Sequence, residues 1–385
     1  MKLDKLCILF TDGDWIESKD QSDSGIRLIQ TGNIGNGEFL YKNDKAKYIS
    51  VDTFKRLNCK EVFPNDILVS RLPEPVGRGC IIPDIGEKMI TAVDCTICRI
   101  NENLVDRKYF CYFLESNAYK TQLEQYVTGT TRKRISRKNL SSVEIDIPEQ
   151  AKQKEVVYKL DRLKKIIQNY NRELDLLDEL VRARFVEMFG DPVINSCQFP
   201  VQPMTDICDI IDGDRGKNYP KSEEILDDGY CLFLNAKNVT QKGFDFENCN
   251  FITREKDDAL RNGKLSRGDV VLTTRGTVGN LAYYSKNVPY ENIRINSGMV
   301  ILRMNRSILN EIYFIELFKM KLSDIKEKIA SGSAQPQLPI STMNKIILMI
   351  PPLELQNQFA SFVKEIDKSR LLSNHSLLLL KSIIF

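Results

Sequence analysis

The second half of this 385-residue chain repeats the first. Landmark residues recur in the same order at a nearly constant spacing: 200 positions for the first pair (212 − 12), and 203 for the second (269 − 66) and for those after it. The matched pairs are Asp12 and Asp212, Asp66 and Asp269, Gly129 and Gly332, and Pro148 and Pro351. A repeat of this length indicates one structural unit used twice. Because the chain is also too long for one ordinary hydrophobic core, we expect two related domains.

Each half begins with a segment that predicts a twisted β-sheet combined with helices, an α/β (α+β) fold. Residues 1–147 and 191–350 are rich in short apolar and β-branched runs, such as Asp-Ile-Leu-Val-Ser at 66–70, separated by Gly, Pro, Asn and Asp. A more helical stretch follows the strands in each domain, at 106–126 and at 309–329. The sequence therefore predicts two tandem domains of the same fold.

The segments after these domains, 148–190 and 351–385, predict long helices. In the first, apolar residues recur at alternating steps of four and three, with charged residues between them, as in a coiled coil. Its seam is Val156, Leu160, Leu163, Ile167, Tyr170, Leu174, Leu177 and Val181. The second seam begins with Phe359, Val363 and Ile366 and is then interrupted by Arg370 and Ser373.

Two such helices in one chain are most simply buried against each other as an antiparallel coiled coil. The alternative is that each helix covers only its own domain. A helix of about 38 residues is about 57 Å long, on the order of one and a half turns of duplex DNA. We therefore expect the helices to act as a spacer.

Composition indicates a folded globular protein, with 42% hydrophobic residues and a mean hydropathy of −0.29. No apolar run reaches the ~18 residues of a membrane span, and the apolar stretch near the N-terminus is too short for a signal peptide. We expect a cytoplasmic protein without membrane contact. Its ten cysteines are scattered and are expected to be reduced thiols.

Cys95 and Cys98 have the spacing of a zinc knuckle. No second such pair follows, and His375 is the one histidine, so a four-ligand site would need scattered cysteines. A buried strand explains this pair better than a metal site does.

The order and duplication of these segments resemble the specificity (S) subunit of type I restriction-modification systems. The matching sequences are Gly-Asp-Val-Val-Leu-Thr-Thr-Arg-Gly-Thr-Val-Gly at 268–279, the Ile-Pro exits at 147–148 and 350–351, and Arg-Phe-Val-Glu-Met-Phe-Gly-Asp-Pro at 184–192. The resemblance covers essentially the whole chain. It implies that 1–147 and 191–350 are target-recognition domains and that 148–190 and 351–385 are spacer helices.

The resemblance also implies partners. Each domain would read one half of a bipartite site in double-stranded DNA. The chain would bind two modification subunits, which use S-adenosylmethionine to methylate adenine, and restriction subunits, which use ATP and Mg²⁺ and cleave DNA. No cofactor is expected in this chain itself.

The sequence carries no recognisable catalytic motif of its own. An amino-methyltransferase motif and a Walker A motif are both missing from it, and Gly213 to Asn218 lacks the glycine spacing of a phosphate loop. With one histidine and no convincing carboxylate pair, general acid–base chemistry has no obvious agents. We expect a non-catalytic chain.

Residues 132–138 place five cations among seven residues directly after Gly129, which predicts a DNA-contacting loop. The matching loop after Gly332 carries glutamines instead, as expected if the two domains read different bases. A solvated charged face is the alternative for any of these residues. The candidate DNA contacts are Arg71, Arg78, Arg132, Lys133, Arg134, Arg137, Lys138, Arg215, Lys217, Lys237, Arg275, Gln335, Gln337 and Lys345.

Two other functions fit part of this pattern. A non-catalytic scaffold would use the two domains and the apolar last helix to hold proteins together. An RNA-binding tandem would use the same basic loop. Copurified partners distinguish the first from a DNA-specificity role, and competition between duplex DNA and RNA distinguishes the second.

Overall fold

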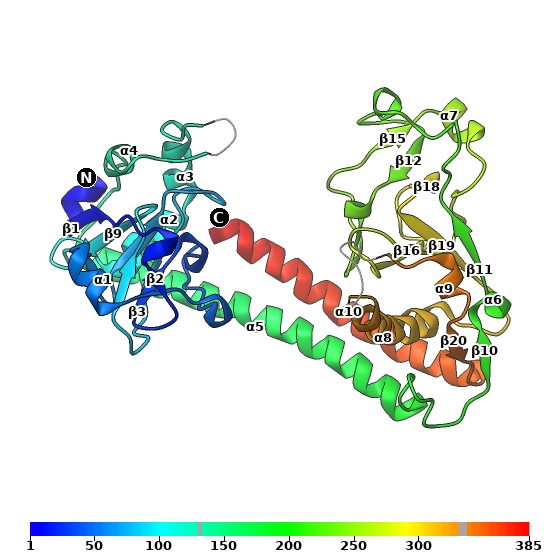
Figure 1. Cartoon of the computed structure of the whole chain (residues 1–385). Helices are drawn as coiled ribbons and strands as arrows, with labels where there is room; N and C mark the ends of the chain where they lie inside the picture. The colour runs from blue at the N-terminus through cyan, green and yellow to red at the C-terminus, as the bar shows by residue number, and fades with distance from the viewer. Residues whose placement is uncertain (130–132, 331–336, 385) are drawn as a thin grey trace. The chain divides into compact units, whose positions relative to one another are not determined.

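The computed structural model describes residues 1–129, 133–330 and 337–384 and divides into two compact units (Figure 1). The first unit contains Met1–Asn171 and Asn374–Phe385, and the second contains Arg172–Ser373. The division falls inside both long helices, so each unit includes one part of each helix.

The first unit contains a four-stranded sheet in the order β1-β9-β6-β7 and a five-stranded sheet in the order β2-β4-β3-β8-β5. The strands of the first sheet are β1 (Cys7–Asp12), β6 (Ile67–Ser70), β7 (Gly79–Ile81) and β9 (Cys95–Ile100). Those of the second are β2 (Gln21–Ser22), β3 (Ile26–Ile29), β4 (Tyr48–Ile49), β5 (Glu61–Val62) and β8 (Met89–Thr91). The short helices are α1 (Val51–Arg56), α2 (Arg107–Glu115), α3 (Asn117–Glu124) and α4 (Arg137–Ser141).

The second unit repeats this plan, with a four-stranded sheet in the order β11-β19-β16-β17 and a three-stranded sheet in the order β15-β12-β18. The strands are β11 (Cys208–Asp212), β12 (Cys231–Leu234), β15 (Phe251–Ile252), β16 (Val270–Thr273), β17 (Leu281–Tyr283), β18 (Ile293–Ile295) and β19 (Met299–Met304). Two small pairs are β10 (Val201–Pro203) with β20 (Ile347–Met349) and β13 (Val239–Thr240) with β14 (Gly243–Phe244). The shorter helices are α6 (Met204–Ile207), α7 (Arg254–Ala259), α8 (Glu311–Ala330) and α9 (Ile340–Met343).

Side-chain alternation along the strands explains the layers of each unit. In β16, Val270 and Leu272 pack in one buried cluster with aromatic residues of α8, whereas Val271 packs in another with residues of β12 and β18. In β6, Val69 packs with α2 and Leu68 packs with β3 and β8. Each four-stranded sheet is therefore covered by helices on one face and by the second sheet on the other. The predicted α/β (α+β) repeat is confirmed.

The repeated aspartates of the sequence have the same structural task. Asp66 accepts two hydrogen bonds from the guanidinium of Arg99, at 2.9 and 2.8 Å, and Asp269 accepts two from Arg303 at the same distances. Both carboxylates are about 97% buried, and each also accepts a backbone N–H at the turn before its strand. A bidentate arginine and a backbone donor stabilise a buried carboxylate.

The long helices are α5 (Gln150–Phe189) and α10 (Leu353–Ile384). Helix α5 begins just after Pro148. It ends at Gly190, which adopts a left-handed backbone with φ of 73° and donates its N–H to the carbonyl of Val186 at 2.8 Å. At about 1.5 Å per residue, its 40 residues span about 60 Å.

Within the second unit, the end of α5 and the start of α10 run antiparallel. Phe359 of α10 makes edge contacts with Phe185 and Phe189, with ring centroids 5.4 and 5.6 Å apart. Further along α10, Arg370 binds Asp178 at 2.5 Å. Residue numbers fall along α5 as they rise along α10, so this part of the predicted antiparallel pair is present.

The predicted seam is buried only where the end of α5 meets the start of α10. Val181, Phe359 and Val363 are buried, whereas the remaining seam residues are half-buried, namely Val156, Leu160, Leu163, Ile167, Tyr170, Leu174, Leu177 and Ile366. The interruption at Arg370 and Ser373 does not end the pairing of α5 with α10, because both polar side chains bond to residues of α5. Ser373 donates its hydroxyl to Glu173 at 3.0 Å. Polar contacts therefore replace apolar packing in this stretch.

Within the described part of the chain, no helix has the length and apolar character needed to cross a membrane.

Candidate nucleic-acid interface

Three loops of the first unit meet where β1 and β6 end. The turn after β1 is tied to the turn before β9, since Gly13 and Asp14 donate their N–H groups to the carbonyls of Cys95 and Thr91 at 3.0 and 2.9 Å. Arg71, just after β6, donates its N–H to Asp94 and accepts the N–H of Ile135 at 3.2 Å. These bonds join the basic loop to the end of the sheet.

The second unit builds the same arrangement from equivalent residues. Thr274, just after β16, donates its N–H to Gly298 at 2.9 Å and accepts the N–H of Leu338 at 3.0 Å. Gly213 lies close to the turn before β19, because a Cβ added to it would come within 2.2 Å of the carbonyl oxygen of Asn296. A Cβ added to Gly13 in the first unit would likewise come within 2.3 Å of the carbonyl oxygen of Thr91. The backbone is duplicated, and the exposed side chains differ.

Exposed basic residues of the first unit gather at this cluster. Lys133, Arg134 and Lys138 are exposed, and Arg137 lies near Asp12, with an N–O distance of 3.9 Å, and near the Thr11 hydroxyl at 3.4 Å. Arg132 lies outside the described residues. The structure thus brings the end of the basic loop to the end of β1.

Arg71 and Arg78 are buried, which differs from the exposed position expected of side chains that contact DNA. They are 6% and 8% exposed. The Arg78 guanidinium donates to four carbonyls, at 2.6 to 2.9 Å, and burial lowers its pKa. Arg71 donates to the carbonyl of Ile135 at 3.3 Å and faces Asp12 at 3.3 Å. Both arginines hold the loops in place.

In the second unit the equivalent surface carries Arg215, Arg275 and Gln337, all exposed. Arg275 and Gln337 are paired through a backbone bridge, and Arg215 binds Asp212 and the carbonyl of Ser297 at 3.0 and 3.3 Å. These three candidates therefore lie on one loop cluster. Gln335 lies outside the described residues.

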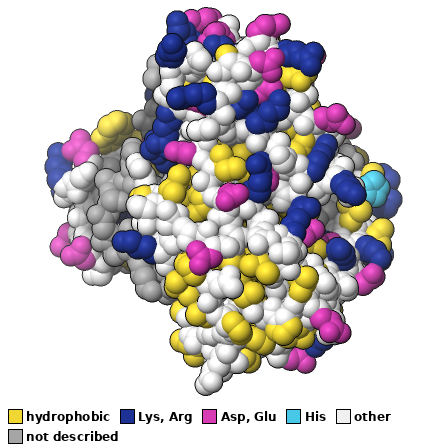
Figure 2. All heavy atoms as spheres, turned by 90° about the vertical axis from the view of Figure 1, so that its right-hand side faces the viewer, with side chains coloured by type: hydrophobic (Ala, Val, Ile, Leu, Met, Phe, Trp, Pro, Cys, Tyr) yellow, Lys and Arg dark blue, Asp and Glu magenta, His cyan; other side chains and the backbone are white. Residues whose placement is uncertain are grey.

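The remaining candidates of the second unit are less tightly grouped. Lys217 is exposed on the loop after Arg215, Lys237 is exposed in the turn after β12, and Lys345 is exposed in the turn before β20. On the face shown in Figure 2, Lys and Arg side chains are interspersed with Asp and Glu. Charge alone does not mark a DNA surface there.

Two exposed residues of the first cluster were not among the predicted contacts. Lys60 binds Asp14 at 3.3 Å and the Asp12 carbonyl at 3.2 Å through its ammonium group. Trp15, one residue after Asp14, is 70% exposed. The 200-residue shift, which aligns Trp15 with Arg215, could have identified the tryptophan from sequence.

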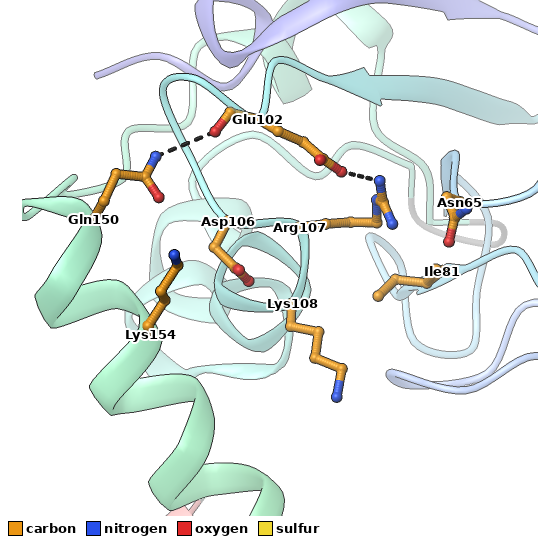
Figure 3. A pocket seen from close by; sticks show the side chains of 8 residues that line it. All are labelled: Asn65, Ile81, Glu102, Asp106, Arg107, Lys108, Gln150 and Lys154. Carbon is orange, nitrogen blue, oxygen red and sulfur yellow. Dashed lines mark hydrogen bonds and ion pairs between the residues drawn. The ribbon is translucent and has the colours of Figure 1, made fainter.

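A cavity of about 510 Å³ in the first unit is not part of the duplicated cluster (Figure 3). Two of its cations are paired: Arg107 binds Glu102, and Lys108 binds Asp161 at 2.6 Å. Ile81 lines this cavity, and strand pairing makes Tyr283 its equivalent in the second unit. The Tyr283 hydroxyl donates a hydrogen bond to Glu311 at 3.1 Å. The lining of the cavity therefore differs between the repeats at this position.

Cys95 and Cys98 cannot share a metal ion. Cys95 packs in the cluster between the two sheets, and Cys98 packs on the opposite face with α2. Burial raises the pKa of the Cys95 thiol to about 12. Among the side chains that the structure describes, no group of three or more His, Cys, Asp or Glu is arranged to hold a metal.

Comparisons with known proteins agree with the duplication. The family model "Type I restriction modification DNA specificity domain" matches residues 1–178 and again residues 199–381. The chain is 22% identical over 383 residues to the type I restriction enzyme MjaIX specificity subunit of Methanocaldococcus jannaschii, covering 95% of this chain and 85% of that one. It is 20% identical over 371 residues to the putative MjaX specificity subunit of the same organism, covering 90% and 78%.

One solved structure shows the same fold over the full chain. It comes from work on complex assembly and conformational transition of the type I R-M system. The match has a TM-score of 0.56 at 14% identity and covers 100% of this chain and 94% of that chain.

Proposed function

Because this chain belongs to the family of type I restriction-modification DNA specificity domains, we propose that it gives a type I restriction-modification complex its DNA sequence specificity. Each unit reads one half of a bipartite site in double-stranded DNA. Helices α5 and α10 set the gap between the halves.

One observation carries this proposal: the two loop clusters share a backbone and differ in exposed side chains. Ile135 and Leu338 make the same backbone bond, to Arg71 and Thr274 respectively. Around these bonds the first unit presents Lys and Arg, whereas the second presents Arg275 and Gln337. Arginine suits guanine edges and glutamine suits adenine edges, so two copies of one scaffold can read two different half-sites.

The partners follow from the family and from the surface of α10. Family members of this kind are non-catalytic, so modification and cleavage belong to other subunits. These are two methyltransferase subunits, which bind S-adenosylmethionine, and restriction subunits, which use ATP and Mg²⁺, all in the cytoplasm. Leu371, Leu372 and Leu378 are 71%, 71% and 67% exposed, and such an apolar stripe fits a protein partner.

Methylome sequencing tests the proposal. Cells that express this chain with its methyltransferase should show a split adenine-methylated motif, and cells that lack the chain should lose that motif. A methyltransferase that modifies the same motif without this chain would contradict the proposal.

The same exposed leucines also suit a scaffold that holds proteins without DNA. Purification of the full complex separates the two functions. Site-specific duplex binding that RNA does not displace supports the specificity role, whereas stable protein partners with no DNA affinity support the scaffold.

A further inference from the structure

The residue after the Asp-Gly-Asp turn is an exposed aromatic residue in the first loop cluster. Trp15 is the one tryptophan of the chain, and it is 70% exposed. An indole ring facing water is unfavourable by itself, because aromatic rings contribute stability when they are buried. Tryptophan is enriched at binding interfaces, so an exposed tryptophan beside a candidate binding loop suits a contact that a ligand completes.

The backbone beside Trp15 is firmly held. Asp14 accepts the N–H of Lys60 at 2.6 Å and donates its own N–H to Thr91 at 2.9 Å. The close approach of Gly13 to Thr91 leaves no room for a side chain at that position. The backbone that carries the ring is therefore positioned before any ligand arrives, which reduces the entropy cost of binding.

The surroundings of the ring favour a base over a phosphate. The indole N–H donates to the Glu17 carboxylate at 3.4 Å. Hydrogen bonds from Lys19 and from Trp15 lower the pKa of Glu17, so its carboxylate is ionised at neutral pH. Lys19 is paired with the same carboxylate at 2.7 Å, so these two charges offset each other, whereas the apolar ring face remains available to an apolar part of a base. In the major groove that part is the methyl group of thymine.

The second unit keeps the turn and replaces the aromatic residue. Asp214 accepts the N–H of Arg261 at 2.8 Å, as Asp14 accepts that of Lys60. At the position of Trp15 stands Arg215, which is also exposed. An unchanged turn that presents a ring in one copy and a guanidinium in the other is expected where the copies differ in the base that they read.

We propose that Trp15 reads a thymine of the first half-site through its ring face, and that Arg215 occupies the same reading position toward the second half-site. This inference rests on the proposed function and names a specificity-determining position within it. Trp15 acts through apolar contact, so it contributes to the choice of base and leaves the number of phosphate contacts unchanged.

Selection from a pool of randomised duplex DNA tests the inference with the full chain. The wild type should yield a two-part motif. Trp15→Ala should lose the preference for one T·A pair in the first half-site, keep every other position, and bind the wild-type motif roughly tenfold more weakly. Trp15→Phe should retain the preference. Tyr158→Ala, which removes a 61% exposed aromatic side chain from α5, is the matched control and should change neither motif nor affinity.

A change in the DNA then tests the atom that is read. Replacing that thymine by deoxyuracil removes its methyl group and should weaken wild-type binding roughly fourfold. It should leave binding by Trp15→Ala unchanged. Fluorescence of this single tryptophan should also change on binding the thymine duplex.

Separate results overturn the inference and the proposed function. If the wild type selects a two-part motif and Trp15→Ala selects the same motif with equal affinity, the inference is wrong and the function stands. The inference is also wrong if Trp15→Ala loses all positions of the first half-site together, or if deoxyuracil weakens wild type and variant equally. If the wild type selects no motif, the proposed function itself fails.

Discussion

Gln153 and Gln356 make the same three hydrogen bonds in the two repeats. Gln153 accepts the N–H of Asp106 at 2.7 Å and donates to the carbonyls of Leu104 and Pro148 at 3.3 and 2.8 Å. Gln356 accepts the N–H of Asn310 at 2.9 Å and donates to Ile308 and Pro351 at 3.0 and 2.8 Å. Each glutamine ties the first turn of a long helix to the loop before the helix that covers the sheet.

Replacing either glutamine by alanine should therefore destabilise its own unit. Gln153 and Gln356 are 1% and 0% exposed, so each change leaves buried donors and acceptors without partners. We expect a loss of about 2–4 kcal/mol in the free energy of unfolding, measured by urea denaturation. Gln168→Ala and Gln358→Ala remove exposed glutamines from the same helices and should change stability by less than about 0.5 kcal/mol. Equal effects of buried and exposed glutamines would refute this role.

Phe359 should contribute strongly to helix pairing in the second unit. It is fully buried and contacts Phe185 and Phe189 of α5. Phe359→Ala should lower the free energy of unfolding by about 3–5 kcal/mol, because it leaves a cavity between the helices. Leu371→Ala removes a 71% exposed apolar residue from the same helix and should have little effect. A small effect of both substitutions would argue against the packing described.

The sequence predicted the repeat and the chemistry of its landmarks better than it predicted burial. Asp66 and Asp269 were found by spacing, and the structure gives them equivalent arginine partners. By contrast, Arg71 and Arg78 were candidate DNA contacts or surface charges, and the structure buries both, although charged residues are rarely buried. Their burial depends on carbonyl groups that distant segments supply, such as those of Ile34 and Ile135. No local pattern reveals such partners.

The interruption of the second helical seam was a similar case. A heptad pattern treats Arg370 as a break, since it scores apolar residues alone. The structure pairs Arg370 with Asp178, across the helix pair and 192 positions away in sequence. Such a contact can be predicted only once the two helices have been aligned antiparallel.

Asp214, in the Asp-Gly-Asp turn of the second unit, should make stability depend on pH. Backbone N–H groups of Gly216 and Arg261 donate to Asp214 and lower its pKa to about 2. The unfolded value is about 3.9. A carboxyl with a lowered folded pKa stabilises the fold above its unfolded pKa, and this contribution is lost as the pH falls toward the folded value.

Asp214→Asn should accordingly be less stable than the wild type at pH 7, and this difference should shrink between about pH 4 and pH 2. Urea denaturation across that range measures it. Asp258→Asn, which changes an exposed aspartate of the same unit, serves as the control. A stability difference that stays constant down to pH 2 would contradict the role assigned to Asp214.

The basic loop should contribute phosphate contacts to DNA binding. Replacing Arg132, Lys133 and Arg134 with alanine should weaken binding and reduce the slope of log affinity against log salt by roughly one for each phosphate that is no longer neutralised. A control variant removes three exposed cations of α5, Lys154, Lys159 and Lys165, and so removes the same charge elsewhere. If both variants show equal reductions in affinity and slope, the loop has no specific part in binding.

The central claim is that each unit reads its own half of one DNA site. The direct measurement is the affinity of the wild type and of an Arg275→Ala, Gln337→Ala variant for the selected duplex and for duplexes with one half scrambled. We predict that the variant binds the intact duplex more weakly than the wild type does. Scrambling the second half should weaken the variant no further, whereas scrambling the first half should weaken it as much as it weakens the wild type. Two results would contradict the claim. One is that scrambling the first half weakens the variant less than it weakens the wild type. The other is that scrambling the second half weakens the variant as much as it weakens the wild type.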